Sequence, residues 1–369
     1  MIPLISEELK IGNQYIGFSL SFGILGALIA SLVSIYFIRK FGVKNIIYFG
    51  LLLNLAGSIV LFFLPSYLMF TIAYFVLQFG YSIAFICILT IIRNTFKDNK
   101  VKAIFKIDLG YFTGLTIAPL AMSLFFFLKA DWHYFFLFML IPQAILIISM
   151  FFLKIPQNNK NNTSEIKNLK IDFKIIKNKV FIFCGLLIFL NAAMLNTFYD
   201  WFTTYFGGIN KNINYNLLFL STYSFSILAG LLLKNKLTSY FKCKKILLFN
   251  GLFSFISLAG ILLIDMVAIK IAMIFLLGFS LSGNFSLASS IALEYFDDKS
   301  DSISGFLVSL IYLGIIMFQY LDGLFTDKFS TDSMLYINFT LSFIFLVVVL
   351  VFNFSKRFSN DKIKEAYKT

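Results

Sequence analysis

Apolar blocks of about 18 to 27 residues recur along the whole chain, separated by short polar or basic stretches. An α-helix rises 1.5 Å per residue, so about 20 apolar residues cross the roughly 30 Å hydrocarbon layer of a bilayer. The strands of a membrane β-barrel alternate over about ten residues and do not fit such solid blocks. The chain is 59% apolar and 13% charged, whereas a soluble domain is about half apolar and a quarter charged. The pattern predicts an all-α membrane protein.

The blocks predict eleven membrane-spanning helices. They cover residues 14–38, 45–64, 67–92, 104–128, 134–153, 180–206, 215–233, 246–264, 267–294, 302–325 and 333–354. One long polar segment, rich in Lys and Asn, divides five spans from six. We therefore expect a first helix bundle over residues 1–153, a linker over 154–179, a second bundle over 180–355 and a tail over 356–369.

The basic residues alternate between the two ends of the spans. Of the 31 Lys and Arg residues, 26 lie in every second connection and 5 in the others. Cytoplasmic connections carry the excess of Lys and Arg, so we expect the linker and the C-terminus in the cytoplasm and residue 1 outside. The inference is a multi-pass protein of the plasma or inner cell membrane. The net charge of +13 follows from these connections, and no nucleic-acid partner is expected.

Two short basic turns, Phe37–Phe49 and Phe241–Phe249, lie between apolar blocks about 200 residues apart. The same offset relates residues in three separate regions. These include Phe41, Lys44, Leu77, Ser82 and Gly114, which match Phe241, Lys244, Leu277, Ser282 and Gly314. The offset indicates two parallel repeats, a transporter plan. The repeat partner of the span at 180–206 would precede residue 1, so we expect the chain to lack the first helix of a twelve-helix protein.

The first basic turn, Ile35–Lys44, resembles the loop between the second and third helices of the major facilitator superfamily. The family pattern there is Gly-x-x-x-Asp-Arg-x-Gly-Arg-Lys. Gly42 and Lys44 fit it, Lys40 replaces the first Arg, and Arg39 stands where the acid belongs. Residues 106–119 are similar to the fifth helix of the family, and residues 305–327 to its eleventh.

This resemblance implies a secondary active transporter that works by alternating access. In the family, helices 1, 4, 7 and 10 line the solute cavity, which here implies the spans 67–92, 180–206 and 267–294. It also implies a cytoplasmic gate at the first basic turn. Its expected residues are Arg39, Lys40, Gly42 and Lys44, with Asp108 as an acidic partner.

Polar side chains on the implied cavity helices are the candidate solute ligands. They are Gln78, Tyr81, Asn191, Asn196, Tyr199 and Asn284. Amides, hydroxyls and aromatic faces suit a neutral, hydrogen-bonding solute such as a sugar. The same residue types also link helices to one another, and the sequence leaves that alternative open. No arginine lies within a span, which disfavours phosphate esters as solutes.

Two acids near the outer ends of their spans, Asp200 and Asp322, are candidates for binding a coupling proton or sodium ion. Solvation among the lipid headgroups is the alternative. Other functions stay open at this point: drug or metabolite efflux, an inactive remnant, and an intramembrane prenyl or lipid enzyme using the acidic run Asp297–Asp301. No second such run exists, so no enzymatic activity is expected. A metal site, a cofactor and a protein partner are not expected either, and we expect a monomer.

Overall fold

The structure is a computed structural model that describes residues 2–63, 66–95, 100–152, 177–209, 213–296 and 300–354. These residues form thirteen helices: α1 Ile2–Leu9, α2 Asn13–Phe41, α3 Val43–Phe63, α4 Tyr67–Thr95, α5 Lys100–Phe127, α6 Tyr134–Phe152, α7 Lys179–Ile209, α8 Ile213–Leu237, α9 Cys243–Leu263, α10 Val267–Leu281, α11 Asn284–Tyr295, α12 Ser300–Lys328 and α13 Ser333–Phe354. Eleven spans within them are long and apolar enough to cross a membrane, which confirms the predicted class and number.

Two features differ from the sequence prediction. The span expected at 267–294 is divided into α10 and α11, which meet at Gly283 with a left-handed φ of +68°. Side chains with a Cβ rarely adopt that conformation, so the glycine permits the break. The second feature is α1, an unpredicted helix of eight residues. At 1.5 Å per residue it is too short to cross a bilayer.

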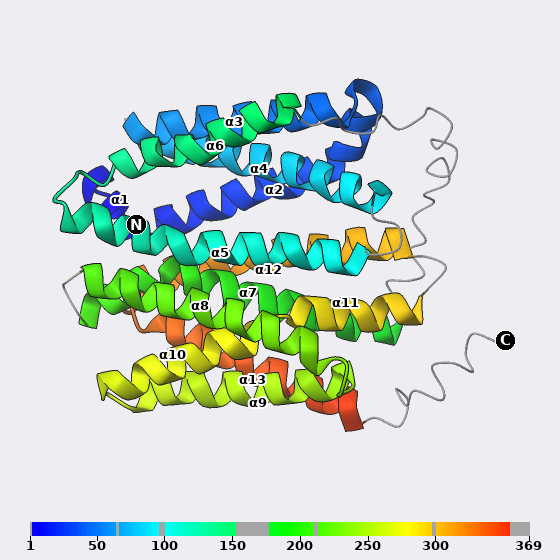
Figure 1. Ribbon diagram of the computed structural model, residues 1–369. Helices are drawn as coiled ribbons and strands as arrows, with labels where there is room; N and C mark the ends of the chain where they lie inside the picture. Colours follow the sequence, from blue (N-terminus) through cyan, green and yellow to red (C-terminus); the bar gives the residue numbers. More distant parts are fainter. Residues whose placement is uncertain are drawn as a thin grey trace.

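The predicted repeat is confirmed by the helix boundaries themselves (Figure 1). α3 and α9 cover 43–63 and 243–263, and α5 and α12 begin at 100 and 300. α4 over 67–95 matches α10 and α11 together over 267–295. Residues 41–50 and 241–250 also share the same pattern of buried and exposed positions, residue by residue. The expected linker, 154–179, lies outside the described residues except for 177–179, and the expected tail, 356–369, lies outside them entirely.

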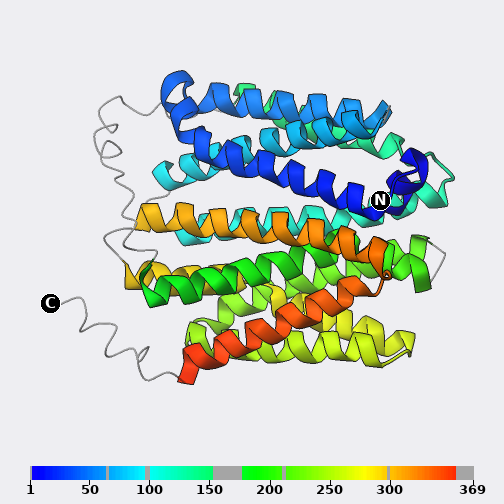
Figure 2. The same ribbon diagram turned by 180° about the vertical axis from the view of Figure 1, so that it is seen from behind.

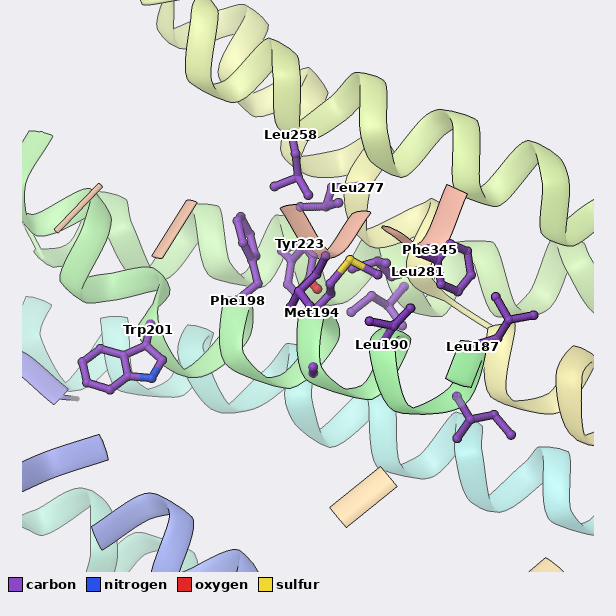
Figure 3. Close-up of a cluster of buried hydrophobic side chains, with 14 of the residues drawn as sticks. Leu187, Leu190, Met194, Phe198, Trp201, Tyr223, Leu258, Leu277, Leu281 and Phe345 are labelled. Carbon is purple, nitrogen blue, oxygen red and sulfur yellow. The ribbon is translucent and has the colours of Figure 1, made fainter. Parts of the chain in front are cut away.

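The second half of the chain, α7 to α13, is built around α7 (Figure 3). Side chains three, four or seven residues apart on α7 form a buried face: Leu187, Leu190, Met194, Phe198 and Trp201. They pack in one cluster with residues of α8, α9, α10 and α13, among them Tyr223, Leu258, Leu277, Leu281 and Phe345. In a bilayer such contacts stabilise mainly through close packing, since lipid is as apolar as the side chains.

The first half, α2 to α6, has no helix equivalent to α7 among the described residues. α1 corresponds at the same offset to the last eight residues of α7, 202–209. α2, α3 and α4 pack together and α6 lies on α3, whereas α5 runs along α8 of the second half and touches α4 only briefly. The difference shows at one pair of glycines. A Cβ on Gly314 of α12 would meet the carbonyl oxygen of Phe189 in α7 at 2.5 Å, but a Cβ on Gly114 of α5 would meet nothing within 4 Å.

Candidate functional site

The halves of the chain meet along α2 and α12, which lie side by side in the view from behind (Figure 2). Two glycines allow the helices to approach closely: a Cβ on Gly17 would lie 3.1 Å from the Cα of Gly323. Nearby, the carboxylate of Asp327 accepts hydrogen bonds from the backbone N–H groups of Asn13 and Gln14, at 2.8 and 2.7 Å. These groups are unpaired at the start of a helix and attract negative charge. An acid of α12 therefore caps α2.

Asp200 of α7 lies near tyrosines that come from several helices. Tyr74 of α4, Tyr111 of α5 and Tyr199 of α7 are close enough to Asp200 to be influenced by its charge, and Tyr312 of α12 lies near Tyr111. Tyr111 is 41% exposed despite these neighbours. Within this group, Asp200 was predicted as an ion-coupling residue and Tyr199 as a solute ligand.

Further hydrogen bonds tie this group to both halves of the chain. The Tyr199 hydroxyl donates to the carbonyl of Leu115 in α5, at 3.1 Å. The hydroxyls of Tyr312 and Ser82 are 3.2 Å apart and join α12 to α4. Tyr111 and Tyr312 had no role in the sequence prediction because α5 and α12 were not expected to line the cavity. Their hydroxyls in the middle of apolar spans were the available signal.

Gln319 of α12 orients Asp200. Its amide nitrogen donates to the Asp200 carboxylate, and its amide oxygen accepts from the indole N–H of Trp201 at 2.9 Å. Gln319 and Trp201 are buried, at 1% and 0% exposure. Both ends of the amide are therefore used, and its orientation is determined by its neighbours.

Asp322 lies one turn further along α12 and is completely buried. Neither of its carboxyl oxygens has a hydrogen-bond partner within the described part of the chain. The hydroxyl of Thr197 lies near it but donates to the carbonyl of Ala193. A buried, unpaired carboxylate is costly.

Three asparagines form a chain of amides inside the second half. The Asn284 nitrogen donates to the Asn191 oxygen at 2.8 Å, and the Asn284 oxygen accepts from Asn250 at 2.5 Å. All three are at most 5% exposed. The structure thus brings together two predicted ligands, Asn191 and Asn284, in contact with each other. The sequence analysis did not name Asn250, which lies on a helix with no expected role in the cavity.

The other predicted ligands lie apart from that chain. The Gln78 amide donates to the Tyr74 hydroxyl at 2.9 Å, which places Gln78 beside the tyrosine group. Tyr81 is 39% exposed and stacks on Phe85. Asn196 bonds the carbonyl of Ala192 in its own helix.

The structure describes only some of the residues expected to form the cytoplasmic gate. Gly42 ends α2 with a φ of +83°, and the Lys40 ammonium lies 5.2 Å from the ring centre of Phe41. Lys44 is partly buried at the start of α3. The side chains of Arg39 and Asp108 lie outside the described residues, so their expected contact stays a prediction. The same holds for the acidic run, since 297–299 and the side chain of Asp301 are not described.

The chain resembles known proteins in its sequence family and in its fold. No curated protein sequence matches the chain. Solved structures that share the fold include two transporters. One is a D-xylose-proton symporter, with a TM-score of 0.75 and 14% identity, covering 92% of this chain and 87% of that one. The other is a mutant form of the nucleoside transporter NupG, with a TM-score of 0.78 and 15% identity, covering 94% and 92%. The family model described as Major Facilitator Superfamily matches residues 1–319. The chain belongs to the Major Facilitator Superfamily of membrane transporters.

Proposed function

We propose that this protein is a secondary transporter that moves a small, neutral, polar solute of the sugar or nucleoside class by alternating access. The observation that carries the proposal is the tyrosine group around Asp200, which draws on helices of both halves of the chain. Hydroxyls and aromatic faces bind polyhydroxylated solutes and stack on flat rings. The two structural neighbours, a sugar symporter and a nucleoside transporter, support the same class.

Alternating access needs a contact between the halves that can break. The contacts of α2 with α12 run from Gly12–Asp327 to Ser21, whose hydroxyl donates to the Ile316 carbonyl. They lie toward the end opposite the basic turns. If the basic turns lie in the cytoplasm, as proposed, these contacts would close the outer side. Breaking the Asp327 cap and separating the glycine pair would open that side.

Coupling to protons is assigned to Asp322 and Asp200. A protonated Asp322 fits its buried surroundings, whereas its charged form requires water or a rearrangement of α7 against α12. The proton would therefore bias the populations of the two states. Gln319 bonds Asp200 and precedes Asp322 by about one turn of α12, so it would transmit the change to the solute site.

The test is uptake by proteoliposomes containing the full chain, with radiolabelled pentoses, hexoses, nucleosides, amino acids and drugs. Each solute is measured with and without an inward proton gradient. We expect saturable uptake of a sugar or nucleoside that the gradient increases. Uptake confined to amino acids or drugs, or no uptake of any solute, would contradict the proposed function.

Two variants separate coupling from binding. Asp322→Asn should lose gradient-driven accumulation but retain exchange of labelled for unlabelled solute. Glu7→Gln, at an exposed acid of α1, is the control and should retain both. Loss of exchange together with accumulation in Asp322→Asn would place this residue in the solute path instead.

A further inference from the structure

Lys234 of α8 is a buried lysine whose ammonium contacts only backbone oxygens and an aromatic ring among its described partners. The side chain is 3% exposed. Its Nζ donates to the carbonyl oxygens of Phe279, Ser280 and Ser282, at 2.6, 3.1 and 2.8 Å. An ammonium has three N–H donors, so all of them are used. The ring centre of Phe279 lies 5.2 Å from the same nitrogen, within the range of a cation–π contact.

These carbonyls are available because α10 ends there. The last four carbonyls of a helix have no partner within it, and no water reaches them in the middle of a bilayer. A cation at this position also complements the negative end of the helix dipole. Gly230, one turn earlier on α8, allows the approach: a Cβ there would lie 2.8 Å from the Phe279 carbonyl oxygen. Lys234 therefore closes the end of α10.

The internal repeat offers a comparison within the same molecule. At the 200-residue offset Lys234 corresponds to Ser34 of α2, which is buried and donates to Ser31 of its own helix. The helix that α2 packs against, α4, continues without a break through Ser82 and Ile83, the positions equivalent to the α10–α11 joint. At these equivalent positions, which the structure describes in both halves, the buried ammonium accompanies the interrupted helix and a serine the continuous one.

We propose that Lys234 is a positioning residue that holds the joint between α10 and α11 and thereby sets Asn284, the first residue of α11. Asn284 is bonded to Asn191 of α7, the helix that carries Tyr199 and Asp200. The link to solute binding rests on the proposed function. The dependence of the joint on Lys234 does not.

The experiment measures the joint and the solute affinity in the same full-length protein. Cys87, Cys184 and Cys243 are replaced, and spin labels are attached at Phe275 and Ser290, exposed positions of α10 and α11. Lys234→Met should shift or broaden the distance distribution between the labels. It should also raise the KM for the transported solute about tenfold, with a smaller change in kcat. Lys236→Met, at an exposed lysine of the same helix turn, should change neither.

Rescue distinguishes a positioning cation from a merely space-filling side chain. In Lys234→Ala, n-propylammonium should restore the narrow distance distribution, whereas tetramethylammonium, which has no N–H donor, should not. If Lys234→Met does not fold, the Ala variant prepared with n-propylammonium is measured before and after its removal. The proposal is overturned if the distance distribution is unchanged in Lys234→Met. It is overturned equally if the distribution of the Ala variant is unchanged when n-propylammonium is removed. If the unmodified protein transports no solute, the proposed function fails, while the distances still decide the role of Lys234.

Discussion

At the residue scale, buried polar groups are the features that decide how the halves of this protein meet. Asp327 belongs to α12 yet caps α2, and Gly12, the residue just before α2, supplies no side-chain cap. The bond is therefore both a helix cap and a connection between the two repeats. In the proposed alternating-access cycle, only the state closed toward the outside would contain it.

Replacing Asp327 with Ala removes two hydrogen bonds to a charged acceptor. Such bonds stabilise by about 1.5–3 kcal/mol, so the population of the state open to the outside should rise at least about tenfold. The measurement is the rate at which an impermeant maleimide labels Ser21→Cys in intact cells, in a background without native cysteines. Glu7→Ala is the matched control. An unchanged labelling rate in Asp327→Ala would show that the cap does not close this side.

Gln319→Leu should destabilise the protein by about 1–3 kcal/mol, because Trp201 and Asp200 would each lose a partner in a buried setting. Thermal unfolding followed by size-exclusion chromatography measures the loss. Met317→Leu, an exposed position on the same helix, should leave the melting temperature unchanged. Equal melting temperatures for the two variants would contradict the role given to the Gln319 amide.

The sequence located some of these residues and not others, for physical reasons. A polar side chain within an apolar span is rare enough to be noticed, and Asn191, Tyr199, Asp200 and Asn284 were identified in this way. Lys234 was counted among the basic residues of a loop because its span was expected to end at residue 233. α8 continues to Leu237, and only the tertiary structure shows that this lysine turns inward to the end of α10.

At the scale of elements, the helices were predictable and their interruptions were not. Solid apolar blocks specify a membrane helix because a bilayer leaves the backbone no other way to satisfy its hydrogen bonds. Gly283 did not predict the break, because an isolated glycine is tolerated within helices. The apolar sequence of the expected span 267–294 also continues on both sides of it. Lys234, which contacts the end of α10, comes from another helix, so no local sequence pattern encodes that contact.

Gly114 and Gly314 are equivalent positions in different surroundings, so one substitution can be compared in both. Gly314→Ala places a Cβ against the Phe189 carbonyl and should destabilise by about 1–3 kcal/mol. Gly114→Ala meets no neighbour and should be neutral or stabilising by up to about 1 kcal/mol, because alanine favours the helix. The two melting temperatures give the comparison. Equal destabilisation would mean that this face of α5 is covered as tightly as that of α12.

At the scale of the whole molecule, the charge alternation makes an independent prediction. Green fluorescent protein fused after residue 369 should fluoresce, and alkaline phosphatase fused there should be inactive, because the C-terminus is expected in the cytoplasm. The same reporters fused in the 129–133 connection should give the opposite result. Matching signals at the two sites would refute the assigned orientation.

The packing of α5 has a consequence for how the protein is made. α5 rests mainly on α8, which follows it by roughly 100 residues. At about 5–20 residues per second of synthesis, an interval on the order of 5–20 s separates the synthesis of α5 from that of α8, its main partner. The interval between the synthesis of α2 and that of α12 is longer still. α2 and α5 therefore cannot reach their final packing before the second half is made. A nascent chain stopped before α8 is the species that membrane chaperones and quality-control proteases would meet.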